Sequence, residues 1–278
     1  MQHQKLPQVQ PPIAISKLSV GTARKMKIAS HWKTPRTLEK EGIYYPYLLN
    51  SKPKTILGKE VKKVCNLTHH PLLTESLAEI AYRTVHSGFW IGENKCNKKR
   101  GDSPICKICG EIETVTHTFC LCKKAQPLWD SILKWWKKRT SEDLPGSPRV
   151  VLLGLREDDP DDIDAEDTQF SELTLPFTYL RTHTIDTLKR ERQRIINGLE
   201  GRSNKELVQL TLREVQKSAN ALYGAAKEWD KWNPPKDKEK HTANPRTMTS
   251  FMETWVHSGL AILTKSASLP IILRAQGH

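Results

Sequence analysis

The chain has 278 residues, of which 37% are hydrophobic and eight are tryptophan, and its formal net charge is +13. This composition is sufficient for the packed core of one large or two small domains. No apolar run approaches the roughly 20 residues of a membrane helix, and the Gln- and Pro-rich start does not resemble a signal peptide, so we expect an intracellular protein, nuclear or cytoplasmic, in a reducing compartment.

Residues 1–35 contain four prolines in polar sequence without hydrophobic periodicity, and we interpret them as a flexible lead-in. A first domain is predicted at residues 36–145. Within it, apolar residues recur at helical spacing from Leu73 to Val85, and Gly88 follows them. This pattern predicts one amphipathic helix ahead of a polar, basic run.

A second amphipathic helix is predicted in the segment QPLWDSILKWWKKR. Leu128, Ile132 and Leu133 share one face with Trp129 and Trp136, and lysines occupy the other face. The helical spacing of the two tryptophans favours a role in packing over base stacking. We expect them to pack against the first helix.

The remaining sequence predicts a linker and a helical C-terminal region. Residues 150–155 are apolar and predict a short strand or buried turn, and a dense run of carboxylates follows, so residues 146–170 form a predicted acidic linker. Residues 171–278 are predicted to be helical, with helices near 170–196, 204–232 and 248–265 and a charged linker near 233–247. The expected fold is mainly α, with a helix–zinc knuckle–helix unit followed by this helical region.

Four of the six cysteines fall within residues 106–122, beside a histidine. Cys106, Cys109, His117 and Cys122 follow the pattern Cys-x2-Cys-x7-His-x4-Cys. A Cys-x-x-Cys pair lets two thiolates reach one ion from a tight turn, and a His and a Cys further on complete a tetrahedron. The spacing therefore predicts a Zn²⁺ site, and four protein ligands leave no open position for catalysis.

Other interpretations of these cysteines are weaker. A redox pair is expected where a buried strand enters a helix, whereas this segment is polar and turn-like. Buried, inert cysteines would not explain the clustering beside a histidine. Cys120 competes with Cys122 as the fourth ligand, although the spacing favours Cys122. Cys65 and Cys96 are predicted to be free thiols in a reducing compartment.

The positive charge is concentrated around the predicted metal site. Residues 1–150 hold 26 Lys and Arg against 12 Asp and Glu, whereas residues 151–278 hold 18 against 19. A local excess of this kind favours polyphosphate partners, although Lys-rich surfaces also occur on proteins that bind no nucleic acid. The predicted nucleic-acid contacts are Lys95, Lys98, Lys99, Arg100, Lys123 and Lys124, with Trp90 as a further candidate.

The segment CKICGEIETVTHTFCLCKKAQPLWDSI resembles the zinc-binding domain found downstream of reverse transcriptase in non-LTR, LINE-type retrotransposons. The matching features are the Cys-x2-Cys-Gly opening, Glu113-Thr114, His117 followed by Phe119, the closing Cys122, and Trp129 in the next helix. The preceding TVHSGFWIG is also similar. The resemblance covers about residues 70–140 and departs from the family at Cys120 and Lys123.

The resemblance implies the C-terminal part of a retrotransposon polyprotein, in which the zinc knuckle positions RNA template or target DNA for the parent reverse transcriptase. No polymerase is expected in this chain, because residues 156–159 lack the aromatic residue of the polymerase signature. A nuclease pattern that begins at Pro160-Asp161 requires a second carboxylate at residues 174–176, and none of these residues is acidic. A ribonuclease H needs carboxylates spread over several strands to bind two metal ions, whereas the acidic residues here cluster in one predicted loop or lie on helix faces. The alternative is a zinc-stabilised protein-interaction module that does not bind nucleic acid.

Overall fold

The computed structural model describes residues 68, 70, 72–85, 88–92, 103–154, 175–233, 245–262 and 271–272. All of them belong to the compact unit Tyr45–His278. The predicted lead-in of residues 1–35, the acidic run of residues 157–167, and the predicted free thiols Cys65 and Cys96 lie outside the described residues.

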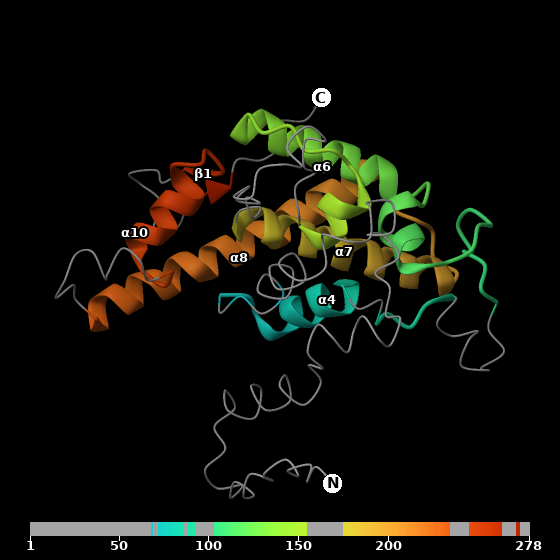
Figure 1. The fold of residues 1–278 in the computed structure, drawn as a ribbon, viewed down its shortest axis with the longest axis horizontal. Helices are drawn as coiled ribbons and strands as arrows, with labels where there is room; N and C mark the ends of the chain where they lie inside the picture. Colours follow the sequence, from blue (N-terminus) through green and yellow to red (C-terminus); the bar gives the residue numbers. More distant parts are fainter. Residues whose placement is uncertain are drawn as a thin grey trace, which may run out of the picture. The chain divides into compact units, whose positions relative to one another are not determined.

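The described residues are mainly helical, as expected from the sequence (Figure 1). The first helix in this part, α4, spans Glu75–Val85 and buries the predicted apolar stripe. It begins after Thr74, whose Oγ1 accepts a hydrogen bond from the Leu77 N–H at 3.4 Å, as an N-cap side chain does. Its main contacts are with helix α7, Leu175–Ile196, and the π-helical turn η3, Arg149–Leu153.

Helix α6 spans Ala125–Thr140 and has the predicted buried face, which Trp135 extends. Both tryptophans that the sequence assigned to packing are buried. The Trp129 Nε1–H donates to the Phe119 carbonyl at 2.7 Å, and the Trp136 Nε1–H donates to Glu142 at 2.9 Å, so neither indole leaves an unpaired donor. Trp136 packs edge-on against Phe177 of α7, with ring centroids 5.1 Å apart.

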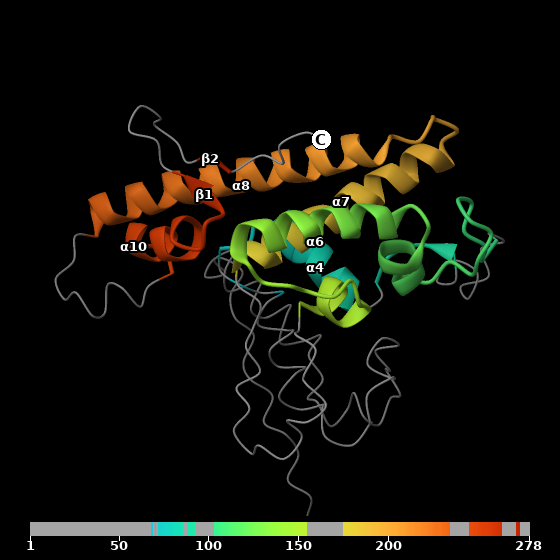
Figure 2. The same ribbon diagram turned by 90° about the horizontal axis from the view of Figure 1, so that it is seen from above.

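The apolar run near residue 150 forms a buried π-helical turn, η3, at Arg149–Leu153. Its four apolar side chains are at most 1% exposed, which confirms the buried-turn alternative. Helix α7, Leu175–Ile196, lies between α4 and α6 in Figure 1, and α8 runs alongside it (Figure 2). Every residue of α7 from Pro176 to Leu188 is buried, so this helix is central and is not amphipathic in its first half.

Threonines make this central helix compatible with burial. The hydroxyl of Thr182 donates to the Thr178 carbonyl, and that of Thr184 donates to the Leu180 carbonyl, both at 2.7 Å. A hydroxyl that bonds one turn back along its own helix needs no partner elsewhere. Because the sequence of α7 is polar, its hydrophobic periodicity does not indicate that the helix is buried.

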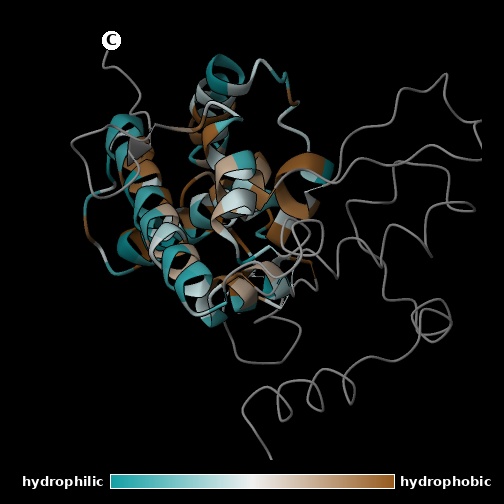
Figure 3. Ribbon diagram, turned by 90° about the vertical axis from the view of Figure 1, so that its left-hand side faces the viewer, coloured by the Kyte–Doolittle hydropathy of each residue, from teal (hydrophilic) through white to brown (hydrophobic). Residues whose placement is uncertain are grey.

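Helix α8 spans Asn204–Trp232 and begins at a capping box. The Ser203 hydroxyl accepts from the Glu206 N–H at 3.3 Å, and the Glu206 carboxylate accepts from the Ser203 N–H at 2.8 Å. Leu207, Val215 and Ala219 are among its buried residues. Bands of hydrophilic and hydrophobic residues alternate along the helices in Figure 3, as expected of amphipathic helices.

The end of the chain differs from the predicted helix at residues 248–265. Helix α10, Met248–Phe251, continues as the π-helical turn η4, Met252–Val256, and the chain then leaves the helix. Gly259 has φ +76°, and a Cβ there would lie 2.9 Å from the Arg139 carbonyl oxygen, so the turn needs glycine. Strand β1, Ala261–Ile262, then pairs antiparallel with β2, Ile271–Ile272, so the prediction of a helix beyond Val256 is wrong.

One hydrophobic cluster joins α4, α6, α7, α8 and the α10–η4 segment. It contains core residues from both sides of the predicted linker, so the described parts of the two predicted domains share a core. The domain boundaries themselves stay predictions. None of the described helices has both the length and the apolar content needed to cross a bilayer.

Candidate metal centre

A short hairpin carries the first two predicted ligands. Ile105 and Ile112 form an antiparallel bridge, and the Cys106 N–H donates to the Glu111 carbonyl at 2.7 Å. Between them the Gly110 N–H donates to the Cys106 carbonyl at 2.9 Å, with Gly110 at φ +85°. A left-handed residue at this position closes the turn. The turn brings the thiols of Cys106 and Cys109 to the same side.

A π-helical turn, η2 at His117–Leu121, carries the third ligand. The Thr114 Oγ1 accepts from the His117 N–H at 2.9 Å, at the first residue of the turn. At the other end, the Cys122 N–H donates to the His117 carbonyl at 2.7 Å, a spacing of five residues. This wide turn places His117 and Cys122 beside one another, as π-helical turns often do at functional sites.

The four ligand atoms form one cluster. The Sγ atoms of Cys106 and Cys122 are 4.0 Å apart, those of Cys109 and Cys122 are 3.9 Å apart, and Cys109 Sγ lies 3.0 Å from His117 Nε2. All four ligand atoms lie within 4.8 Å of one another. Zn–S bonds of about 2.3 Å in a tetrahedron place two sulfurs about 3.8 Å apart, which the two sulfur pairs match closely. The cluster can therefore hold a metal ion.

The structure distinguishes the two candidates for the fourth ligand. Cys122 belongs to the cluster, whereas Cys120 is excluded from it and its thiol faces the Gly146 carbonyl at 3.5 Å. Burial raises the pKa of the Cys120 thiol to about 12, so it stays protonated. Cys120 is thus the inert, buried cysteine that the sequence alone did not separate from the ligands.

The ionisation of the cluster is consistent with metal binding. Burial lowers the pKa of His117, partly offset by Glu113 and Glu111, so its imidazole is neutral and able to ligate at pH 7. Burial, with the nearby Cys106 and Cys109, raises the pKa of the Cys122 thiol to about 12. Packed thiols resist ionisation without a cation, and a divalent ion reverses this by binding the thiolates.

Glu113 attaches the ligand segment to α7. Its carboxylate is buried and accepts two hydrogen bonds from Arg192, both at 2.5 Å, and one from the Gly92 N–H at 2.8 Å. Burial alone would raise the pKa of Glu113, but these hydrogen bonds and the charge of Arg192 hold it below its usual value. Glu113 is therefore an ionised anchor. No local pattern predicts this pair, because its partners are 79 residues apart.

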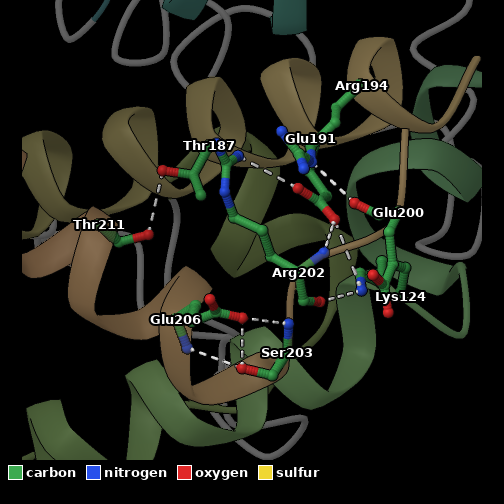
Figure 4. A network of polar contacts seen from close by, with 9 residues as sticks. All are labelled: Lys124, Thr187, Glu191, Arg194, Glu200, Arg202, Ser203, Glu206 and Thr211. Carbon is green, nitrogen blue, oxygen red and sulfur yellow. Dashed lines mark hydrogen bonds and ion pairs between the residues drawn. The ribbon is translucent and has the colours of Figure 1, made fainter. Parts of the chain in front are cut away.

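A second contact joins Lys124, two residues after the last ligand, to the same helix (Figure 4). Glu191 of α7 is fully buried and accepts from the Arg202 N–H at 2.6 Å and from its Nη1 at 3.3 Å. Lys124 lies 3.6 Å from this carboxylate and also donates to the Arg202 carbonyl. Two adjacent residues of α7 thus form ion pairs on either side of His117 and Cys122. Glu191 pairs with Lys124, and Arg192 pairs with Glu113.

The predicted nucleic-acid contacts have different outcomes. Lys95, Lys98, Lys99 and Arg100 lie outside the described residues. Lys123 is exposed, and Trp90 is 38% exposed. Lys124 is half-buried in the network around Glu191, so its ammonium already has two partners within the protein.

No protein-family model and no solved structure matches the chain.

Proposed function

We propose that Cys106, Cys109, His117 and Cys122 bind a structural Zn²⁺ ion, and that the resulting knuckle presents a basic surface to nucleic acid. The observation that carries this proposal is the convergence of the four ligand atoms within 4.8 Å. Three thiolates and one imidazole are a ligand set that zinc prefers, and it fills a tetrahedron. The site therefore has a structural role, and the chain is not an enzyme by this proposal.

In this proposal the metal stabilises a segment that has little apolar core of its own. The hairpin of residues 103–112 buries few apolar side chains, and Cys106 is one of them. Such a segment lacks the core that would hold it folded, so ligation supplies the missing free energy. Glu113 and Lys124 also connect this segment to α7 through their ion pairs with Arg192 and Glu191. The Cys122 carbonyl accepts a hydrogen bond from the Ala125 N–H at 2.7 Å, where α6 begins. The proposed helix–knuckle–helix unit is thus rigid only with its ion.

The nucleic-acid part of the proposal is supported by charge and by the retrotransposon resemblance. Lys95, Lys98, Lys99 and Arg100 lead directly into the hairpin, and Lys123 follows the last ligand and is exposed. Phosphate contacts from such residues position a protein on RNA or DNA without reading its sequence. In a LINE-type element this surface would hold RNA template or target DNA near the polymerase of the parent polyprotein.

Metal analysis tests the first part. Full-length chain purified without chelator should contain one zinc per molecule, and Cys106→Ser should contain almost none. Cys120→Ser is the matched control, since it removes a thiol of the same segment that lies outside the cluster, and it should keep its zinc. Zinc loss in both variants, or in neither, would refute the ligand assignment.

Binding of a labelled oligonucleotide at several salt concentrations tests the second part. Lys98→Glu/Lys99→Glu should weaken binding and flatten its salt dependence, because fewer counterions are released. Lys227→Glu/Lys231→Glu makes the same change in net charge on α8 and should have a smaller effect. Binding that is absent in the unmutated protein, or independent of salt, would exclude this function and favour the protein-interaction alternative.

A further inference from the structure

A cavity of about 300 Å³ lies between the C-terminal half of α8 and the segment formed by α10 and η4. Helix α10 lies beside this half of α8 (Figures 1 and 2). Three aromatic residues line the cavity: Trp229 of α8, Phe251 of α10 and Trp255 of η4. None of the four proposed metal ligands lines it. Cavities of this volume with a mainly apolar lining are the usual sites of small-molecule binding.

Small residues of α8 leave this space open. Ala225 and Ala226 both line the cavity, and they lie between two larger lining residues of the same helix, Leu222 and Trp229. Ala225 is exposed, whereas Ala226 is 4% exposed. The cavity therefore reaches from the surface of α8 into the core.

The walls of the cavity are held in place by contacts of their own. Phe251 and Trp255 are at most 5% exposed, and their rings are nearly parallel, with centroids 6.2 Å apart. Tyr223 of α8 packs edge-on against Phe251, with ring centroids 5.4 Å apart. The Asp230 carboxylate accepts a hydrogen bond from the Met248 N–H at 3.1 Å and so joins α8 to the start of α10. Ordered walls reduce the entropy that is lost when a ligand binds.

The lining contains one charged residue, Arg246. This residue is exposed, and its Cζ lies 5.1 Å from the centroid of the Trp229 ring. The cation–π contact holds the guanidinium against an aromatic wall of the cavity. A guanidinium binds a carboxylate through two parallel hydrogen bonds. The cavity thus combines an aromatic interior with a cationic group at its exposed edge.

We propose that this cavity binds a small aromatic carboxylate. The ring system of the ligand would lie among Trp229, Phe251 and Trp255, and its carboxylate would pair with Arg246. This inference goes beyond the proposed function and does not involve the metal ion.

The size and charge of the cavity disfavour other occupants. At about 30 Å³ for an atom of the size of a water oxygen, it holds about ten non-hydrogen atoms. A helix of a partner protein is about 10–12 Å across and is too large for it. A cationic ligand would be repelled by Arg246. An aromatic ring, unlike an aliphatic chain, also gains favourable ring contacts with the three aromatic side chains.

Isothermal titration calorimetry with the full chain tests the proposal. The probe is naphthalene-2-carboxylate, and the comparison compound is naphthalene-2-carboxamide, which has the same ring system without the charge. One carboxylate should bind per chain, and the amide should bind about tenfold more weakly. Ala225→Leu places a larger side chain at the cavity and should weaken the binding of both compounds about tenfold. Ala221→Leu is the matched control, because Ala221 is exposed one turn earlier on α8 and does not line the cavity.

Arg246→Gln separates the charge from the packing. This variant should bind the carboxylate about tenfold more weakly and the amide as well as the unmutated protein does. Arg213→Gln removes an exposed cation of α8 outside the cavity and should change neither affinity. Circular dichroism checks that each variant is folded.

Two results would overturn the proposal. One is the absence of carboxylate binding to the unmutated chain. The other is an equal loss of binding in Ala221→Leu and Ala225→Leu, which would place the ligand elsewhere. Equal affinity of the unmutated chain for the acid and the amide would contradict the role of Arg246 and, with it, the carboxylate as the ligand class.

Discussion

The hairpin of residues 103–112 and helix α6 are separated by about a dozen residues, yet different forces hold them. Helix α6 buries seven side chains, three of them tryptophans, and packs against α7 and α8. The hairpin exposes most of its side chains, carries two of the proposed ligands, and is followed directly by Glu113, which pairs with Arg192 of α7. Apolar burial acts without any cofactor, whereas a ligand cluster is stabilising only when its ion is bound. The two regions should therefore respond differently to the same perturbation.

Metal removal should give the largest difference between them. With EDTA, the amides of Cys106, Gly110 and Cys122 should lose their protection against hydrogen exchange, because their hydrogen bonds belong to the segment that carries the proposed ligands. Amides in the middle of α8 should stay protected. Uniform loss of protection along the chain would show that the metal supports the whole fold and not this region alone.

A core substitution should produce the opposite pattern. Trp136 is 1% exposed, and Trp136→Ala should lower the free energy of unfolding by about 3–5 kcal/mol through lost packing and the cavity it leaves. Zinc content should be unchanged in the folded protein. Trp232→Ala is the matched control, because Trp232 is 73% exposed and its loss should cost under about 0.5 kcal/mol. Chemical denaturation measures both.

The pair between Glu113 and Arg192 should couple the two regions. Arg192→Met leaves a buried carboxylate with the Gly92 N–H as its one remaining partner, which should cost about 3 kcal/mol or more. Glu113→Gln/Arg192→Met removes both charges and should recover part of this loss. A double variant that is no more stable than Arg192→Met would show that the unpaired charge of Glu113 does not cause the loss of stability.

Acid should weaken the helical core through His183. Burial lowers the pKa of His183 to about 4, and its Nε2 lies 2.8 Å from the Ser218 hydroxyl. In the unfolded state the imidazole takes up a proton near pH 6.5, whereas in the folded state it does so only near pH 4. This group therefore does not reduce the free energy of unfolding above pH 6.5, and it lowers that free energy by about 3 kcal/mol as the pH drops toward 4. His183→Gln should remove this part of the pH dependence. An unchanged pH profile in the variant would contradict the assignment.

The sequence predicted the elements whose signal is local. The faces of α4 and α6 follow from hydrophobic spacing, and Cys106, Cys109, His117 and Cys122 follow from ligand spacing. It did not predict the burial of α7, because Thr178, Thr182 and Thr184 look polar but lie in the core. It also missed Arg192 and Glu191, since nothing near them in the chain indicates their partners, and it extended the last helix past the turn at Gly259.

X-ray absorption at the zinc edge reports the atoms bound to the ion and can therefore identify the proposed ligands. We expect three sulfurs at about 2.3 Å and one nitrogen at about 2.0–2.1 Å, with no bound water, in both the unmutated protein and Cys120→Ser. A shell with fewer sulfurs and an oxygen, or a shell that changes when Cys120 is replaced, would contradict a closed structural site at Cys106, Cys109, His117 and Cys122.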